Sequence, residues 1–259
     1  MKILITGDVV GRTGRRAFDR YTRELKQSRG IDLVIVNGEN SAGGKGISRK
    51  SLDELYRGGA DIVTSGNHIW DNREVYGFID DEPYLVRPAN YPEGAPGKGW
   101  CIYPFRSANV AVINLSGRAF MPEMDCPFQK IEDILAEIGD QADIVILDFH
   151  AETTSEKMAL GWYLDGRVTA VVGTHTHVQT ADERILHQGT AYITDLGMTG
   201  PWDSVIGDEV ECIIRRFTTG MPVRFAVAES GPSVYSGVII DVDDKTNKAI
   251  AIERVLLKQ

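Results

Sequence analysis

The chain has 259 residues, of which 42% are hydrophobic, and this is enough to bury a large core in one domain spanning residues 1–259. A formal net charge of −9 argues against a broad surface for nucleic acids or anionic membranes, so any phosphate-bearing partner must be met locally. No apolar run approaches the roughly 20 residues of a membrane span, and residues 1–5 lead directly into a strand. We therefore expect a cytoplasmic protein without a signal peptide.

Strand-like and helix-like segments alternate over most of the chain. Nearly continuous apolar runs predict strands at residues 2–6, 32–37, 62–65, 144–149 and 168–172. Amphipathic patterns between them predict helices at residues 15–26, 48–57, 72–79, 128–138 and 155–163. This alternation is typical of βαβ units with parallel strands.

Later segments favour antiparallel pairing. Hairpins or strands are predicted at residues 100–104, 109–115, 223–227, 235–241 and 249–256, the last two joined through residues 243–247. A second, partly antiparallel sheet is therefore expected. The loop at 88–99 contains three prolines and three glycines, which fits either a rim of the functional site or a rigid surface turn. Cys101, Cys126 and Cys212 form no C-x-x-C pair, so we expect small core residues and neither disulfides nor thiolate metal ligands.

Polar side chains follow five of the predicted strands, where an open α/β sheet binds its ligands. The candidate metal ligands at these strand ends are Asp8, Glu39, Asn40, Asn67, His150, His175 and His177. If their segment is extended, His175 and His177 point to the same side, which suits two neighbouring metals. His187 has no acidic or histidine neighbour at ligand spacing, so we expect it to face solvent.

Each of these motifs also has an ordinary explanation. Asn67 can be a turn residue, His68 a helix cap, and His150 a buried, hydrogen-bonded histidine; the H-x-H pair can lie on the surface or in the core. Residues 7–14 follow a strand as a dinucleotide loop does, but the spacing is not G-x-G-x-x-G and Asp8 would repel a bare phosphate. The loop around Lys45 matches a P-loop only loosely. Because these ordinary explanations would have to hold independently at all five strand ends, the motifs together favour a metal site.

In chain order, the motifs resemble those of the calcineurin-like metallophosphoesterases, whose pattern is D-x-H, G-D-x-x-D, G-N-H, a lone H and G-H-x-H. Val10 replaces the first histidine of that pattern, and Gly38-Glu39-Asn40 replaces its G-D turn. Together with G-D-V-V-G-R, N-G-E-N, D-F-H-A-E, G-T-H-T-H-V-Q-T-A-D and T-D-L-G-M-T-G-P, these departures look like the bacterial YmdB-like branch. The resemblance runs from Met1 to about Leu257 and implies an α/β fold, a four-layered αββα sandwich with mixed sheets.

The resemblance also implies a ligand assignment and an activity. It puts Asp8, Glu39, Asn40 and His177 on one metal and Glu39, Asn67, His150 and His175 on the other. Glu39 then bridges two transition-metal ions; the nitrogen and oxygen ligands suit iron, manganese or zinc, and the resemblance favours iron or manganese. The expected enzyme is a phosphodiesterase acting on 2′,3′-cyclic nucleotides, with 3′,5′-cyclic ones as further candidates, by attack of a metal-bridging hydroxide and with His68 as general acid.

Two other functions fit the same residues. One is a phosphomonoesterase or nucleotidase with the same metal centre, and the other is a regulatory binding protein that turns over slowly. The expected partner is a small cyclic nucleotide or another phosphodiester. Arg12, Lys45 and Arg118 are the plausible basic residues near the strand ends. A homo-oligomer is a further candidate assembly, and the family resemblance adds a regulatory protein as a candidate partner.

Overall fold

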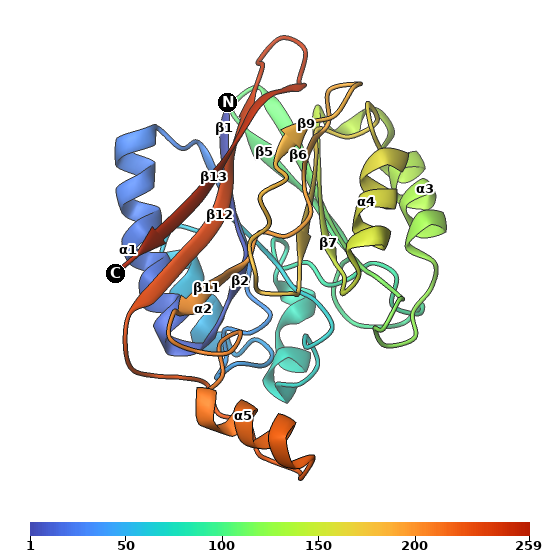
Figure 1. Ribbon diagram of the computed structural model, residues 1–259. Helices are drawn as coiled ribbons and strands as arrows, with labels where there is room; N and C mark the ends of the chain where they lie inside the picture. Colours follow the sequence, from blue (N-terminus) through green and yellow to red (C-terminus); the bar gives the residue numbers. More distant parts are fainter.

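The computed structural model describes residues 1–259 and contains four layers in the order helix, sheet, sheet, helix (Figure 1). The αββα sandwich expected from the sequence is therefore confirmed, with parallel and antiparallel pairs in both sheets. None of its helices is long and apolar enough to cross a membrane.

The first sheet has the strand order β2-β11-β12-β1-β3-β4, with β13 paired to β12. Its strands are β1 (Lys2–Thr6), β2 (Asp8–Val9), β3 (Leu33–Asn37), β4 (Ile62–Thr64), β11 (Met198–Pro201), β12 (Ser233–Val242) and β13 (Ala249–Lys258). Strands β1, β3 and β4 run parallel, whereas β12 is antiparallel to β1, β11 and β13. The predicted hairpin at the end of the chain thus joins the sheet of the first strand.

The second sheet has the order β5-β6-β7-β8-β10-β9. Its strands are β5 (Trp100–Phe105), β6 (Ala108–Ser116), β7 (Ile144–His150), β8 (Ala170–Thr174), β9 (Arg184–Ile185) and β10 (Ala191–Ile193). Strands β6, β7, β8 and β10 are parallel, and the predicted hairpin of β5 and β6 forms one edge.

Helices cover the outer face of each sheet, because each helix has one apolar side that packs against the strands. Helices α1 (Gly11–Arg29) and α2 (Arg49–Arg57) pack on the first sheet, and α3 (Pro127–Ile138) and α4 (Thr154–Tyr163) on the second. The Ser48 hydroxyl caps α2, and Gly30 ends α1 in the left-handed conformation. Every second residue of a strand points toward the other sheet, and these residues form the apolar layer between the two sheets. Examples are Ile3 and Ile35 from the first sheet and Ile146 and Val172 from the second sheet.

Several local predictions were wrong. Residues 72–79 form 3₁₀ turns (Arg73–Gly77 and Ile79–Asp81) rather than an α-helix. Residues 223–227 form no strand, since only Val227 makes an isolated bridge, to Asp208. Helix α5 (Val210–Thr219) and the short strands β2, β9, β10 and β11 were not predicted. Cys101 is buried as expected, but Cys126 and Cys212 are only partly buried.

Candidate metal centre

All eight predicted site residues lie at one edge of the sandwich. Asp8 follows β1, Glu39 and Asn40 follow β3, and Asn67 and His68 come shortly after β4; His150 ends β7, and His175 and His177 follow β8. The carboxyl ends of parallel strands meet at this edge, so segments up to 169 residues apart converge.

Four of the residues form a tight inner group around His150. His150 Nε2 lies 3.1 Å from Glu39 Oε1, 3.0 Å from Asn67 Oδ1 and 3.0 Å from His175 Nδ1. Ligand atoms of Glu39, His150 and His175 all lie within 4.8 Å of one another. Several lone-pair donors thus surround one small volume, which is the arrangement a cation needs.

Asp8 joins this group to His177. Its Oδ1 lies 3.7 Å from His150 Nδ1 and 3.9 Å from His177 Nε2, and its Oδ2 accepts a hydrogen bond from the His175 backbone N–H at 3.2 Å. Glu39 Oε2 accepts from the His68 backbone N–H at 3.1 Å. Each carboxylate therefore has one oxygen fixed by the backbone and one directed elsewhere.

Three buried oxygens at this edge, Asp8 Oδ1, Glu39 Oε1 and Asn40 Oδ1, accept no hydrogen bond. The Asn40 amide nitrogen donates to the Gly44 carbonyl at 2.9 Å, which leaves its oxygen without a partner. Unsatisfied buried oxygens are costly unless a cation or water meets them. Their coincidence in one place fits metal ions held by oxygen and imidazole ligands.

Ionisation at the centre follows from burial and close charges. Burial raises the pKa of Asp8. Burial opposes ionisation of Glu39, but the positive charge of His150 lowers the pKa of Glu39 to about 2. Burial likewise disfavours the charged form of His150, yet the Glu39 carboxylate raises the pKa of that ring to about 9. His175, desolvated beside His150, has its pKa lowered to about 3. Without a cation, a proton on His150 balances the carboxylates; a metal ion would replace that proton.

A chain of hydrogen bonds fixes the orientation of the His150 ring. His150 Nδ1 donates to Thr174 Oγ1 at 2.9 Å, and the Thr174 hydroxyl donates to Asp148 Oδ1 at 2.7 Å. Asp148 is buried, which raises its pKa to about 6, and Asn37 Nδ2 also donates to it. With Nδ1 held in this way, Nε2 is the nitrogen left for a metal. Asp148 belongs to the D-F-H-A-E motif, but nothing in the sequence indicates this role.

The segment of His175 and His177 is not extended, so the condition under which both rings would point to the same side is not met. Both residues have positive φ angles, 99° and 65°, so the two rings make separate contacts. Asp195 stabilises the turn between them, because its Oδ2 accepts from Thr176 N–H at 3.1 Å. The same oxygen accepts from Lys157 Nζ at 2.6 Å, and both side chains of this ion pair are 1% exposed. Sequence patterns gave no signal for this pairing.

A hollow of about 260 Å³ opens onto the centre. Its walls include Glu39, His68, His175 and His177, and the loop residues Lys45, Ile206 and Asp208. His68 is 25% exposed, and its Nδ1 pairs with Asp71 Oδ2 at 2.9 Å. Glu152, which the sequence analysis did not assign, lies 3.1 Å from His175 Nε2. Arg12, Arg118 and the loop at 88–99 do not line this hollow; Arg87 pins that loop as a rigid turn by donating to the carbonyls of Pro96, Pro88 and Ala95.

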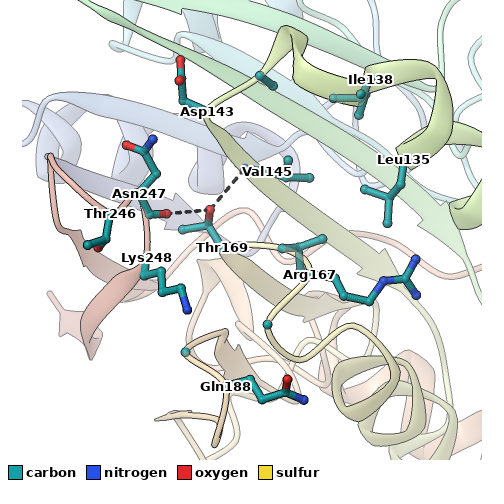
Figure 2. Close-up of a pocket in the computed structure, with 15 residues that line it drawn as sticks. Leu135, Ile138, Asp143, Val145, Arg167, Thr169, Gln188, Thr246, Asn247 and Lys248 are labelled. Carbon is teal, nitrogen blue, oxygen red and sulfur yellow. Dashed lines mark hydrogen bonds between the residues drawn. The ribbon is translucent and has the colours of Figure 1, made fainter.

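A larger hollow of about 390 Å³ lies at the other end of the second sheet (Figure 2). In it, Thr169 Oγ1 donates to the Asn247 carbonyl. Arg167 also lines the hollow and pairs with Glu132 outside it. Its lining contains none of the candidate ligands and no histidine. His187, predicted to face solvent, is exposed and stacks on Trp162.

Comparison with known proteins gives full-length matches. The family model described as YmdB-like protein matches residues 4–255. A Bacillus subtilis protein named 2′,3′-cyclic-nucleotide 2′-phosphodiesterase is 55% identical over 257 residues, covering 99% of this chain and 97% of that protein. A Mycoplasma pneumoniae protein named putative phosphatase/phosphodiesterase is 38% identical and covers 98% of this chain and 92% of its own length.

Solved structures share the architecture. A hypothetical protein from Thermus thermophilus is 41% identical, with a TM-score of 0.94 and full coverage of both chains. A Mycoplasma pneumoniae structure described as a novel phosphatase has a TM-score of 0.94 at 38% identity, covering 100% of this chain and 93% of that one. A putative 5′-nucleotidase from Staphylococcus aureus, 17% identical with a TM-score of 0.63, covers 98% of this chain and 53% of that one, and has the same fold.

Proposed function

This chain belongs to the YmdB-like protein family, and from that premise we propose that it opens 2′,3′-cyclic nucleotides with the help of two metal ions. It is a hydrolase of phosphoester bonds. The observation that carries the finer proposal is the set of three buried, unpartnered oxygens, Asp8 Oδ1, Glu39 Oε1 and Asn40 Oδ1, beside three histidines. A bound cation would offset the cost of burying these oxygens.

Seven side chains would hold the ions. Asp8, Asn40 and His177 would face one ion, Asn67, His150 and His175 the other, and Glu39 both. When bound, two ions supply positive charge to the phosphate oxygens and lower the pKa of a water molecule. Iron, manganese and zinc all accept such ligands, and we favour iron or manganese.

His68 would supply the proton that the leaving oxygen needs. Its Nδ1 is engaged by Asp71, so its Nε2 is the nitrogen available in the hollow. The alkoxide released from a ribose is a poor leaving group, and a positioned acid speeds such a step by about 10²- to 10⁴-fold. The hollow has one lysine in its lining and no arginine, which suits a singly charged diester better than a doubly charged monoester.

Steady-state kinetics with several substrates at one metal concentration test this proposal. We expect 2′,3′-cyclic AMP and bis-p-nitrophenyl phosphate to have clearly higher kcat/KM than p-nitrophenyl phosphate or AMP, and the product of the cyclic substrate to persist as a monoester. Preferential release of inorganic phosphate from monoesters would show a phosphomonoesterase instead. Very slow turnover of every substrate by metal-loaded protein would favour a regulatory binding protein. Activity on 3′,5′-cyclic nucleotides, a cytoplasmic location, a homo-oligomer and a regulatory protein partner remain predictions.

A further inference from the structure

A strongly basic groove lies between α1 and α2, outside the candidate metal centre. It encloses about 520 Å³, and no apolar residue lines it. Its cationic side chains are Arg12, Arg15, Arg16, Arg23, Lys50 and Arg57. Only two acids, Asp19 and Glu54, share the groove, so its formal charge is +4 in a chain whose net charge is −9.

Most of these cations have no carboxylate partner. Glu54 pairs with Arg15 at 2.5 Å, and Asp19 pairs with Arg23 at 2.8 Å. The other four, Arg12, Arg16, Lys50 and Arg57, make no ion pair within the molecule. Arg12 and Arg16 even stand one turn apart on the same helix face, where like charges destabilise a helix. An external anion would remove this repulsion.

The groove begins at the edge that carries the metal centre. Val10 lines the hollow of the centre and Arg12 lines the groove, so their Cα atoms are at most about 8 Å apart. The Gly11 N–H at the start of α1 donates to the Asn40 carbonyl, and Arg15 donates to the Ser41 carbonyl. From there Arg12, Arg16 and Arg23 run along α1 for about 16 Å, beside Lys50 and Arg57 on α2.

The lining indicates the kind of partner. A protein interface needs an apolar or aromatic centre, which this groove lacks. The guanidinium group of arginine makes bidentate hydrogen bonds to phosphate oxygens, and five of the six cationic side chains are arginines. A row of phosphates along an extended strand matches two parallel rows of cations on neighbouring helices.

We propose that the groove binds the backbone of single-stranded RNA whose 3′ end carries the 2′,3′-cyclic phosphate. This inference rests on the proposed function, because such a cyclic phosphate occurs on mononucleotides and at the 3′ ends of RNA strands. The terminal cyclic phosphate enters the centre while upstream phosphates lie between α1 and α2. In the reaction, the water oxygen bonds to phosphorus as the P–O2′ bond breaks. One water proton goes to the released 2′ oxygen, and the other leaves to solvent as the monoester ionises.

Binding is tested without catalysis. The probe is a fluorescein-labelled ten-nucleotide RNA with an ordinary 3′-hydroxyl, followed by anisotropy. Arg16→Glu/Lys50→Glu should raise the Kd at least tenfold, and the slope of log Kd against log salt should fall by about 1.4, since each lost phosphate contact removes about 0.7. The control, Lys130→Glu/Lys248→Glu, makes the same charge change at two unpaired lysines outside the groove and should stay within twofold. Equal weakening by both pairs, or competition by polyglutamate as effective as that by RNA, overturns the proposal.

Catalysis provides the second arm. For Arg16→Glu/Lys50→Glu, kcat/KM should fall at least tenfold on a ten-nucleotide RNA ending in a 2′,3′-cyclic phosphate and stay within twofold on 2′,3′-cyclic AMP. Equal changes on both substrates overturn the role of the groove. If the wild-type enzyme opens neither substrate, the proposed function fails, while the anisotropy result still decides whether the groove binds RNA.

Discussion

At the scale of single residues, Glu39 connects the two groups of candidate ligands. Its Oε1 faces His150, and its Oε2 is held by the backbone of His68. The side chain is 1% exposed, so only protein groups or bound ions can balance its charge. This position suits the bridging role that we propose for Glu39.

Glu39→Gln should therefore remove most of both ions, whereas Asp8→Asn should remove mainly one. The amide keeps the shape of the side chain but removes the negative charge that would lie between the two proposed cations. Elemental analysis of each purified variant measures this, with circular dichroism as the check on folding. Full metal content in Glu39→Gln would place the bridge elsewhere.

His68→Ala should keep its metal ions and lose about 10²- to 10⁴-fold in kcat on 2′,3′-cyclic AMP. The loss should shrink for bis-p-nitrophenyl phosphate, because p-nitrophenolate leaves without a proton. His187→Ala, which changes an exposed histidine away from the centre, is the matched control. Equal losses on the two substrates would assign His68 to phosphate binding rather than to proton transfer.

At the scale of elements, the turn after β4 has no space for a side chain at Gly66. A Cβ atom at Gly66 would lie 2.2 Å from Glu39 Oε2 and 2.4 Å from His150 Nε2, closer than real atoms approach. The strand end must therefore carry glycine for the two ligands to come together.

Gly66→Ala should lower metal content at least tenfold, because the methyl group displaces Glu39 and His150. Gly77→Ala is the control, since a Cβ there meets nothing within 4 Å. Elemental analysis and thermal melts of both variants decide the outcome. Normal metal content in Gly66→Ala would mean that the ligands do not meet as described.

The ion pair of Lys157 with Asp195 links α4 to the turn that carries His175 and His177. Lys157→Met should lower the free energy of unfolding by about 3–5 kcal/mol, because it leaves a buried carboxylate without its cation. Urea denaturation measures the change, and Lys130→Met on α3 serves as the control. A loss below about 1 kcal/mol would show that the Asp195 backbone contacts suffice.

Sequence patterns correctly predicted those elements whose burial follows from the hydrophobicity of their own residues. Residues 33–36 are all apolar and, like Asn37 after them, are buried, so β3 was predicted. Residues 72–79 have a helical period that does not distinguish a 3₁₀ turn from an α-helix. Strand β11 contains glycine and proline, and it pairs with Asp8 and Val9, which no local pattern reveals. The candidate site residues could be predicted to lie at one edge because strand ends are visible in the sequence, whereas Lys157 and Asp195 meet only through the fold.

At the scale of the whole molecule, the middle apolar layer takes residues from both sheets. We therefore expect a single domain with one calorimetric unfolding transition and equal calorimetric and van't Hoff enthalpies. Manganese added to metal-free protein should raise the Tm, since the ligands come from both sheets and ions bind the folded state. Two separate transitions would show that the sheets unfold independently.

The central place of β1 has a consequence for how the protein is made. One neighbour, β3, follows within about 35 residues, but the other, β12, is more than 230 residues away. At about 5–20 residues per second, a ribosome needs roughly 10–50 s between the two strands. During that interval the nascent chain carries an apolar strand with one open edge, which is a hazard for aggregation. The candidate ligand Asp8 is affected in the same way, because it lies on β2, whose partner β11 is also made late in synthesis.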